Sequence, residues 1–195
     1  SAADRDPNSP YVYSRWGNPS VRQLETKLAS LEEAERCLCF ASGMAATSAL
    51  LFSLLEPGDE LIVSDTNYPG TAELVRNSLP RLGVTVIPVD TSSLDDVKRN
   101  VSHKTRLVWI ETPANPILRL CNIKSIAEIA HEADAELVVD STFASPIATR
   151  PIQLGADYVV HSLTKYIGGH GDAMGGAVLG SKNRLERVET EGLIH

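Results

Sequence analysis

Cysteine is scarce in this chain of 195 residues, which has three: Cys37, Cys39 and Cys121. A low, odd number argues against a disulfide framework and favours a reducing compartment, so we expect a cytoplasmic protein. No second pair of cysteine or histidine residues stands at the spacing of a zinc site, so we expect no bound metal. Cys37 and Cys39 share an apolar run, where burial in the core is the simpler interpretation.

Positive charge is also in short supply, because 18 Lys and Arg residues face 25 Asp and Glu residues, for a formal net charge of -7. Such a surface repels polyanions, so we expect no nucleic-acid partner, although a local basic pocket can bind one phosphate. No apolar stretch is long enough to span a bilayer, and the N-terminus lacks a signal-peptide pattern, so we expect no membrane partner. The glycine fingerprints of nucleotide-binding folds are missing too, which weakens a nucleotide-binding α/β domain as an alternative.

The two ends of the chain have no element that closes a domain. Residues 1–10 are polar and break helices, and residues 191–195 stop without a further strand or helix. The length suits one large domain with a substantial core. We therefore expect an N-terminal arm over residues 1–17 and a large domain over 18–195 whose end is truncated.

Between the ends, short apolar runs alternate with amphipathic runs. The expected strands are Cys37–Phe40, Leu61–Ser64, Thr85–Val89, Leu107–Glu111, Leu137–Asp140, Tyr158–His161 and Ala177–Leu179. The expected helices are Ser20–Glu35, Met44–Leu55, Thr71–Arg81, Leu94–Val101, Ile123–Ala133 and Lys182–Glu191. This alternation predicts an α/β fold with a mainly parallel seven-strand sheet sandwiched by helices.

The first expected helix carries two specific local predictions. Ser20 followed by Gln23 has the pattern of a capping box, which would begin the helix at that serine. Leu24, Leu28 and Leu31 fall on one stripe of the helix, which should face the core.

In sheets of this kind, ligands bind beyond the carboxyl ends of the strands, so the residues there are the candidates for a site. Ser42, Gly43 and Met44 follow the first strand and open a helix, where N–H groups can bind a phosphate or simply form a capped turn. Tyr68 follows the second strand, and its ring can stack on a planar ligand or cover the core. Asn115 lies in a loop stiffened by two prolines, which serves either rigidity or a polar contact.

Two ionisable residues at strand ends stand out. Asp140 ends a buried apolar strand, which is costly unless a helix start, an arginine or a ligand cation lies beside it. Lys165 directly follows another buried strand, where a surface lysine is not expected. Ser162 and Thr164 alternate with Leu163, so both hydroxyls can face one anion while Lys165 reaches another atom.

Together these residues supply the parts that pyridoxal phosphate (PLP) requires. Its aldehyde needs an amine, its pyridine nitrogen an acid, its phosphate several donors, and its ring a stacking group. Lys165, Asp140, the start of the helix at Gly43 with the two hydroxyls, and Tyr68 provide one of each. The combination predicts a PLP site, which no single residue would do alone.

Apart from Tyr68, these residues lie in segments that resemble a known family, the Cys/Met-metabolism PLP enzymes, which include cystathionine γ-lyase, methionine γ-lyase, cystathionine γ-synthase and the homoserine-ester sulfhydrylases. The matching segments are YSRWGNPS at 13–20, ASGMAA at 41–46, ETPANP at 111–116, and VVDSTFASP with LGADYVVHSLTKYIGGHGD between 138 and 172. The resemblance covers nearly the whole chain in order. It implies the large domain of a fold-type-I PLP enzyme, without the smaller C-terminal domain that carries an arginine for the substrate carboxylate.

The resemblance also implies a role for each site residue. Lys165 would bind the cofactor as a Schiff base and move protons, Asp140 would keep the pyridine nitrogen protonated, and Tyr68 would stack on the ring and assist the leaving group. Tyr13 and Arg15 would reach the phosphate bound by a neighbouring subunit of a homotetramer built as a dimer of dimers. The other implied cofactor contacts are Ser42, Gly43, Met44, Asn115, Thr142, Ser162 and Thr164.

The resemblance implies γ-elimination at a sulfur-containing amino acid such as cystathionine, which gives a 2-oxo acid, ammonia and a thiol. Gly70 stands where methionine-specialised lyases have a cysteine, so we do not expect a methionine specialist. The alternative reaction is γ-replacement, as in cystathionine γ-synthase or an O-acylhomoserine sulfhydrylase. An alternative of another class is a PLP-binding fragment without catalysis.

Overall fold

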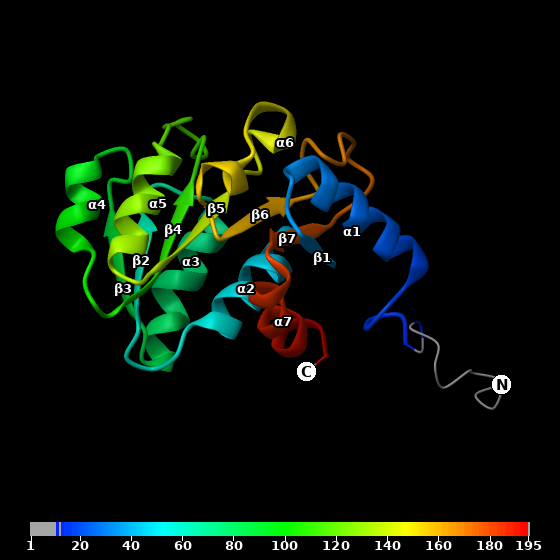
Figure 1. Ribbon diagram of the computed structural model, residues 1–195, viewed down its shortest axis with the longest axis horizontal. Helices are drawn as coiled ribbons and strands as arrows, with labels where there is room; N and C mark the ends of the chain where they lie inside the picture. Colours follow the sequence, from blue (N-terminus) through cyan, green and yellow to red (C-terminus); the bar gives the residue numbers. More distant parts are fainter. Residues whose placement is uncertain (1–10, 12, 195) are drawn as a thin grey trace.

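A seven-stranded sheet forms the centre of the computed structural model, which describes residue 11 and residues 13–194. Its order is β1-β7-β6-β5-β4-β2-β3 (Figure 1), and only the pairs that involve β7 are antiparallel. The strands are β1 (Arg36–Phe40), β2 (Glu60–Ser64), β3 (Thr85–Val89), β4 (Thr105–Glu111), β5 (Glu136–Asp140), β6 (Tyr158–Ser162) and β7 (Gly176–Gly180). The predicted mainly parallel seven-strand sheet is therefore confirmed.

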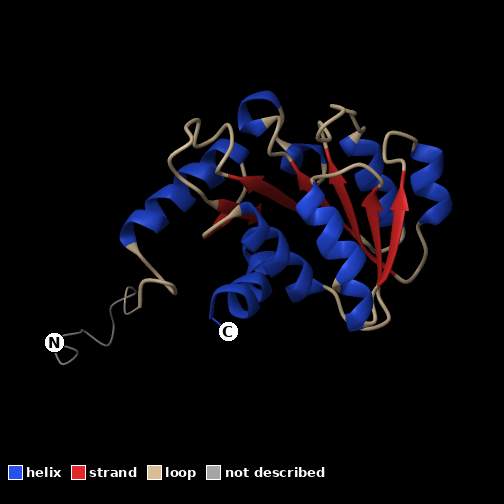
Figure 2. Ribbon diagram, turned by 180° about the vertical axis from the view of Figure 1, so that it is seen from behind, coloured by secondary structure: helices blue, strands red, loops and turns tan. Residues whose placement is uncertain are grey.

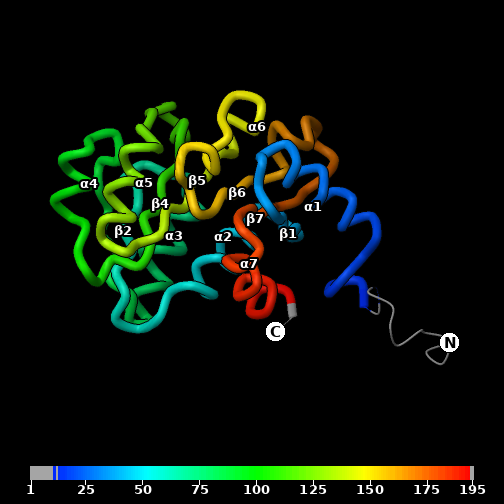
Figure 3. The backbone as a smooth tube through the Cα atoms, viewed as in Figure 1, coloured from blue at the N-terminus to red at the C-terminus, as the bar shows by residue number. Residues whose placement is uncertain are grey.

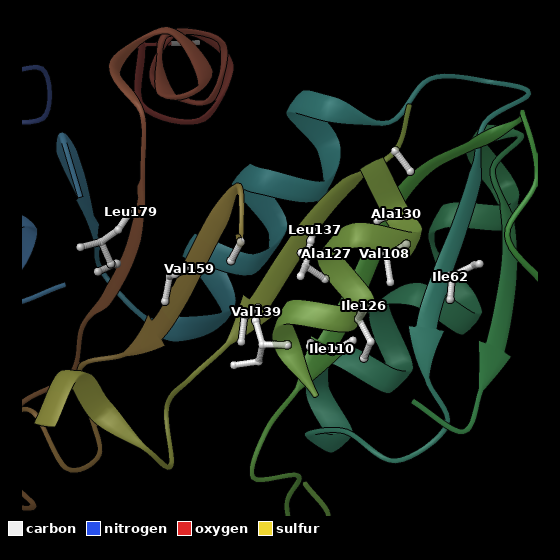
Figure 4. Close-up of a cluster of buried hydrophobic side chains, with 14 of the residues drawn as sticks. Ile62, Val108, Ile110, Ile126, Ala127, Ala130, Leu137, Val139, Val159 and Leu179 are labelled. Carbon is white, nitrogen blue, oxygen red and sulfur yellow. The ribbon is translucent and has the colours of Figure 1, made fainter. Parts of the chain in front are cut away.

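Helices cover both faces of the sheet (Figures 1 and 2). The principal helices are α1 (Pro19–Glu32), α2 (Gly43–Leu54), α3 (Pro69–Asn77), α4 (Leu94–Asn100), α5 (Ile123–Glu132) and α7 (Lys182–Glu189). Helices α1, α4 and α5 pack on one face, where Val108, Ile126 and Val139 belong to a buried cluster (Figure 4). Helices α2, α3 and α7 pack on the other face around Leu50, Trp109 and its neighbours. This two-sided burial explains why the middle residues of the central strands β4 and β5 are apolar on both faces.

The structure contains several short elements that the sequence pattern did not predict. Helix α6 (Ser145–Ala148), the 3₁₀ turns η2 (Leu79–Leu82) and η3 (Pro151–Leu154), and the π-helical turn η4 (Thr190–Ile194) join or follow the main elements. Each is only a turn or so long, so none has an apolar periodicity to read. None of the helices within residues 13–194 combines the length and apolar composition needed to cross a bilayer.

Helix α1 begins at a different residue from the predicted one. Its N-cap is Asn18, whose side-chain oxygen accepts a hydrogen bond from the N–H of Ser20 at 2.9 Å. Ser20 thus lies inside the helix, and the predicted capping box with Gln23 is wrong. Asparagine is among the best N-caps, and the proline that follows it already has the helical φ angle, so this pair sets the start.

The buried stripe of α1 also differs from the prediction. Leu28 is buried, but Leu24 and Leu31 are 41% and 46% exposed, and the acidic residues Glu25 and Glu32 face inward instead. Glu25 accepts a main-chain N–H of β1 at 3.0 Å, which compensates for its burial. The helix lies at the β1 end of the sheet, as does α7 (Figure 3), where polar strand groups need partners.

Of the arm predicted over residues 1–17, residues 1–10 and 12 lie outside the described residues. The remainder leads into α1 through a turn in which the Trp16 and Gly17 N–H groups both donate to the carbonyl of Tyr13, at 2.9 Å each. The side chains of Tyr13 and Trp16 are half exposed, and their rings meet edge to face.

Candidate active site

A cavity of about 780 Å³ opens at the carboxyl ends of the parallel strands, beside the start of α2. This is the place at which α/β sheets bind ligands, because the loops that leave the strands diverge there. The cavity brings together residues from five separate segments of the chain, 42–47, 68–71, 111–115, 140–143 and 160–174. Among the predicted site residues, it is lined by Ser42, Gly43, Met44, Tyr68, Asn115, Asp140, Thr142, Ser162, Thr164 and Lys165.

Asp140 ends β5 and is 8% exposed. Its Oδ1 accepts hydrogen bonds from the Thr142 N–H at 3.1 Å and the Thr142 hydroxyl at 2.6 Å. The same hydroxyl accepts the N–H of Ser162 at 2.9 Å, so it links the ends of β5 and β6. Burial raises the pKa of Asp140. The two hydrogen bonds from Thr142 lower it, as does the nearby His161, but they offset only part of the rise. A cation placed against this carboxylate would favour its charged form.

The start of α2 forms a cradle for an anion. Ser42 caps the helix, because its side chain and its carbonyl accept the third and fourth N–H groups, both at 3.1 Å. The first two N–H groups, of Gly43 and Met44, belong to residues that line the cavity. A Cβ atom at Gly43 would lie 2.8 Å from the Cβ of Ser162, so glycine lets the helix start approach β6 this closely. N–H groups at a helix start, with a serine beside them, are a typical phosphate site.

Thr164 lines the same cavity, but its hydroxyl already has main-chain partners. It donates to the Gly175 carbonyl and accepts the Gly175 N–H, both at 3.2 Å. A hydroxyl carries one proton, so a contact with phosphate would require Thr164 to leave that carbonyl. In the present arrangement, Thr164 ties the turn after β6 to the segment that enters β7.

Lys165 is exposed at the mouth of the cavity, in the turn that follows β6. Its N–H donates to the Ser162 carbonyl at 3.2 Å, and its own carbonyl accepts the Gly169 N–H at 2.7 Å. A Cβ atom at Gly168 would lie 2.6 Å from the Leu163 carbonyl oxygen, so the turn requires glycine there. The turn therefore holds the lysine main chain in place while its amine remains free to reach into the cavity.

Tyr68 is the residue that precedes α3, and its side chain is 43% exposed. A Cβ atom at Gly70 would lie 2.5 Å from the Cε1 atom of the Tyr68 ring and 2.9 Å from the sulfur of Met44. The missing side chain at position 70 thus leaves room for the ring to lie across the start of its own helix. Gly70, the position at which the resemblance led us to expect a cysteine in a methionine-specialised lyase, therefore lies against the predicted stacking group.

Glu111 is a site residue that the sequence reasoning missed. It ends β4, is 4% exposed and pairs in register with Asp140 of β5. Its two carboxylate oxygens accept the N–H groups of Tyr68 at 2.6 Å and Asn115 at 2.8 Å. Burial raises the pKa of Glu111 to about 7, the charge of Asp140 adds to the rise, and the two N–H groups oppose it. The signal was present, because Glu111 is an acid at the end of an apolar strand, as Asp140 is.

Further cavity residues were also missed. Phe143, Tyr166 and His170 line it, and the rings of Phe143 and Tyr166 meet edge to face with centroids 5.6 Å apart. Each lies in a loop that already contained a predicted residue, but no pattern distinguished these side chains from loop residues that point elsewhere.

Tyr13 and Arg15 do not line this cavity. The Arg15 guanidinium lies 5.4 Å from the centroid of the Tyr13 ring, and its Nη1 donates to the Leu193 carbonyl at 2.5 Å. Both residues are exposed at the far end of α1. Their predicted contact with a neighbouring subunit stays a prediction.

The residues of the cavity fit PLP. A buried carboxylate with a raised pKa suits a protonated ring nitrogen, and the start of α2 with Ser162 suits a phosphate. Lys165 supplies an amine and Tyr68 an aromatic face at the same cavity. Most of the donors and acceptors that the cofactor requires are therefore gathered in a single chain.

Comparison with known proteins agrees with this chemistry. Residues 2–192 match the family model described as Cys/Met metabolism PLP-dependent enzyme. An L-methionine γ-lyase from Fusobacterium nucleatum subsp. polymorphum is 44% identical over 94% of this chain and 47% of its own length. A cystathionine γ-synthase from Mycobacterium bovis is 44% identical over 90% of this chain and 45% of its own length. The crystal structure of cystathionine γ-lyase from Lactobacillus plantarum, complexed with L-serine, has a TM-score of 0.93 at 37% identity and covers 98% of this chain and 50% of that one. The chain thus spans about half the length of these relatives.

Proposed function

The chain belongs to the Cys/Met metabolism PLP-dependent enzymes, and from this premise we propose that it catalyses γ-elimination at a sulfur-containing amino acid such as cystathionine. The products would be a 2-oxo acid, ammonia and a thiol. The observation that carries the proposal is the meeting of Lys165, Asp140 and the start of α2 in one cavity. The proposal includes the division into an arm over residues 1–17 and a cofactor-binding domain over 18–195.

The side chains would share the work as follows. PLP, when bound, supplies an aldehyde that captures amines and a ring that accepts electrons from the α-carbon. The amine of Lys165 would hold the cofactor and, once released, carry protons at the α- and β-carbons of the substrate. Asp140, fixed by Thr142, would keep a proton on the ring nitrogen. Tyr68 would stack on the ring and assist departure of the sulfur group.

The second candidate is γ-replacement, in which a thiol is added after the first group leaves. Elimination and replacement share their early proton transfers, so the same residues serve both. The likeness to two proteins named as γ-lyases supports elimination, and the equal identity to a cystathionine γ-synthase supports replacement. Gly70 supports a substrate other than methionine as the preferred one.

The test is a substrate panel on the intact protein, with cystathionine, methionine, and O-acyl-homoserine plus cysteine. We expect release of a 2-oxo acid and ammonia from cystathionine at the highest rate. Exclusive use of the acyl ester would overturn elimination in favour of replacement. Borohydride reduction followed by peptide mapping should place the cofactor on Lys165, whereas a label on another lysine would refute the whole assignment.

The assembly forms a separate part of the proposal. We propose a homotetramer in which Tyr13 and Arg15 of one subunit contact the phosphate bound by another, since Arg15 suits an anion and lies outside its own cavity. Arg15→Ala should then weaken PLP binding about 10-fold, as expected for loss of one charge-assisted hydrogen bond. Titration of PLP into the variant measures this, with Arg22→Ala on the exposed side of α1 as the control. Unchanged affinity would remove the contact between subunits.

A further inference from the structure

Glu111 joins two loops that leave different strands. The loop after β2 carries Tyr68, and the loop after β4 carries Asn115. One carboxylate accepts the N–H groups of both residues, at 2.6 and 2.8 Å. Tyr68 and Glu111 lie 43 positions apart in the sequence, so the carboxylate at the end of β4 ties down the loop that leaves the neighbouring strand β2.

We propose that Glu111 is the positioning residue of the PLP site: it holds Tyr68 and Asn115 at the places from which their side chains contact the cofactor. The inference rests on the proposed function for the identity of the ligand. It does not require Glu111 to touch substrate or cofactor, because the residue acts through two main-chain hydrogen bonds. Hydrogen bonds from N–H groups to a carboxylate are among the stronger ones in proteins.

The surroundings of Glu111 explain why a carboxylate is needed there. Its side chain is buried, and both oxygens are occupied, which compensates for the loss of water. The two N–H groups point at different oxygens of Glu111, so an amide in its place would set its NH2 donor against one of them. A shorter acid reaches the two loops less well.

The two hydrogen bonds that Glu111 accepts from Tyr68 and Asn115, called the clamp from here on, also depend on the charge of Glu111. Asp140 faces Glu111 from β5, and Lys165 and His170 line the same cavity from the turn after β6. The repulsion from Asp140 disfavours the charged form of Glu111, while the two N–H groups favour it. The clamp should therefore tighten as Glu111 loses its proton, because an ionised carboxylate accepts at both oxygens.

Amide hydrogen exchange tests the clamp directly. In the intact protein, Glu111→Gln should lower the protection of the Tyr68 amide or the Asn115 amide about 10-fold or more, and Glu111→Ala should lower both. The Asp65 amide, which donates to the Val89 carbonyl at 2.8 Å, should keep its protection. Unchanged exchange at both positions would overturn the proposal, as would an equal loss at all amides, which marks general destabilisation.

A matched control is available on α3, where Glu73 is exposed. Glu73→Gln removes the same charge as Glu111→Gln but should leave both amides and PLP binding unchanged. If Glu111→Ala does not fold, the glutamine variant carries the test, because it keeps the size of the side chain.

The cofactor provides a second measurement. Glu111→Gln should lower the visible circular dichroism of bound PLP and weaken its binding about 10-fold, as expected when one strong hydrogen bond of the clamp is lost. Glu111→Asp should restore part of both. Wild-type protein that binds no PLP would contradict the proposed function, while the exchange data would still decide the clamp. Wild-type protein that binds PLP, with variants that give the same signal, would contradict the clamp alone.

Discussion

The buried acids of the cavity and Glu32, one of the two buried acids of α1, are held in different ways. Each carboxylate of the cavity accepts two hydrogen bonds: Glu111 from two main-chain N–H groups, and Asp140 from the N–H and hydroxyl of Thr142. On the opposite face of the sheet, Glu32 and His161 are at most 1% exposed and lie 3.5 Å apart. Neither the two oxygens of Glu32 nor the two ring nitrogens of His161 have a hydrogen-bond partner within the described residues.

Strand β6 contributes to both regions, since the Ser162 N–H contacts Thr142 on the cavity side and the His161 side chain faces α1. In the cavity, the polar groups are fixed by neighbouring main chain before a ligand arrives, which suits a binding site. Under α1, Glu32 and His161 face each other at 3.5 Å with no other hydrogen-bond partner among the described residues, which suits the attachment of a helix. The difference separates groups expected to control activity from groups expected to control stability.

The largest expected effect is on stability and concerns the pair under α1. His161→Phe leaves Glu32 buried without its partner and should lower the free energy of unfolding by about 3 to 5 kcal/mol. Replacing both residues, with Glu32→Leu added, should recover most of this loss, because no buried polar side chain is left without its partner. Urea unfolding of the single and double variants measures the difference. A double variant as unstable as the single one would show that the pair is not the cause.

The next effect is the pH dependence that Glu111 gives to stability. Its pKa is about 7 in the folded protein against 4.5 when unperturbed, so its stabilising contribution is complete below pH 4.5 and is lost as the pH rises through 7. Relative to Glu111→Gln, wild-type protein without cofactor should lose up to about 3 kcal/mol of unfolding free energy across that interval.

Urea unfolding at several pH values checks this prediction. Asp140, Lys165 and His170 also face the cavity, but they are present in both proteins, so the difference reports chiefly on Glu111. Asp140→Asn should shrink the difference, because the charge of Asp140 contributes to the raised pKa. Parallel stability curves for wild type and Glu111→Gln would contradict the assignment.

The third effect is on turnover. Asp140→Ala should reduce kcat about 100-fold, close to 2.7 kcal/mol, because the proton on the ring nitrogen loses its charged partner. Cofactor retention should change much less, since Lys165 and the start of α2 remain. Steady-state kinetics with a PLP titration separates the two, and Asp95→Ala on the exposed side of α4 is the control. Near-normal rates would refute the role of Asp140.

The smallest effect comes from the hydroxyl that links β5 and β6. Thr142→Val removes one hydrogen bond to Asp140 and the acceptor for the Ser162 N–H, but it keeps the shape of the side chain. We expect kcat to fall about 10-fold, and the pKa of Asp140 to rise further because a lowering contact is lost. Thr26→Val on the exposed side of α1 should have no effect on turnover. An unchanged rate for Thr142→Val would show that Asp140 does not need this support.

Most of the fold could be predicted from the local pattern of the sequence. Strands such as Leu107–Glu111 are apolar up to their last residue, and the periodic helices between them leave few other arrangements than a mainly parallel sheet. The residues that follow each strand could be read as candidates for one cavity, since parallel strands end at the same edge. The chemistry of PLP then selected a set among them, including Lys165 and Asp140.

Other features depended on contacts between distant segments. Leu24 and Leu31 have the spacing of a buried stripe, yet Glu25 and Glu32 take their place because a strand N–H and His161 lie opposite. Periodicity counts apolar residues and cannot register a partner on another strand.

What the sequence determined by itself was the order of strands and helices and the chemical types gathered at the strand ends, because both follow from local periodicity and residue chemistry. Tertiary structure alone decided that Glu111 bridges Tyr68 and Asn115, that Thr164 is engaged by Gly175, and that α1 turns acids inward. Each of these depends on which main-chain group lies within about 3 Å of a side chain, and only the folded chain sets such distances.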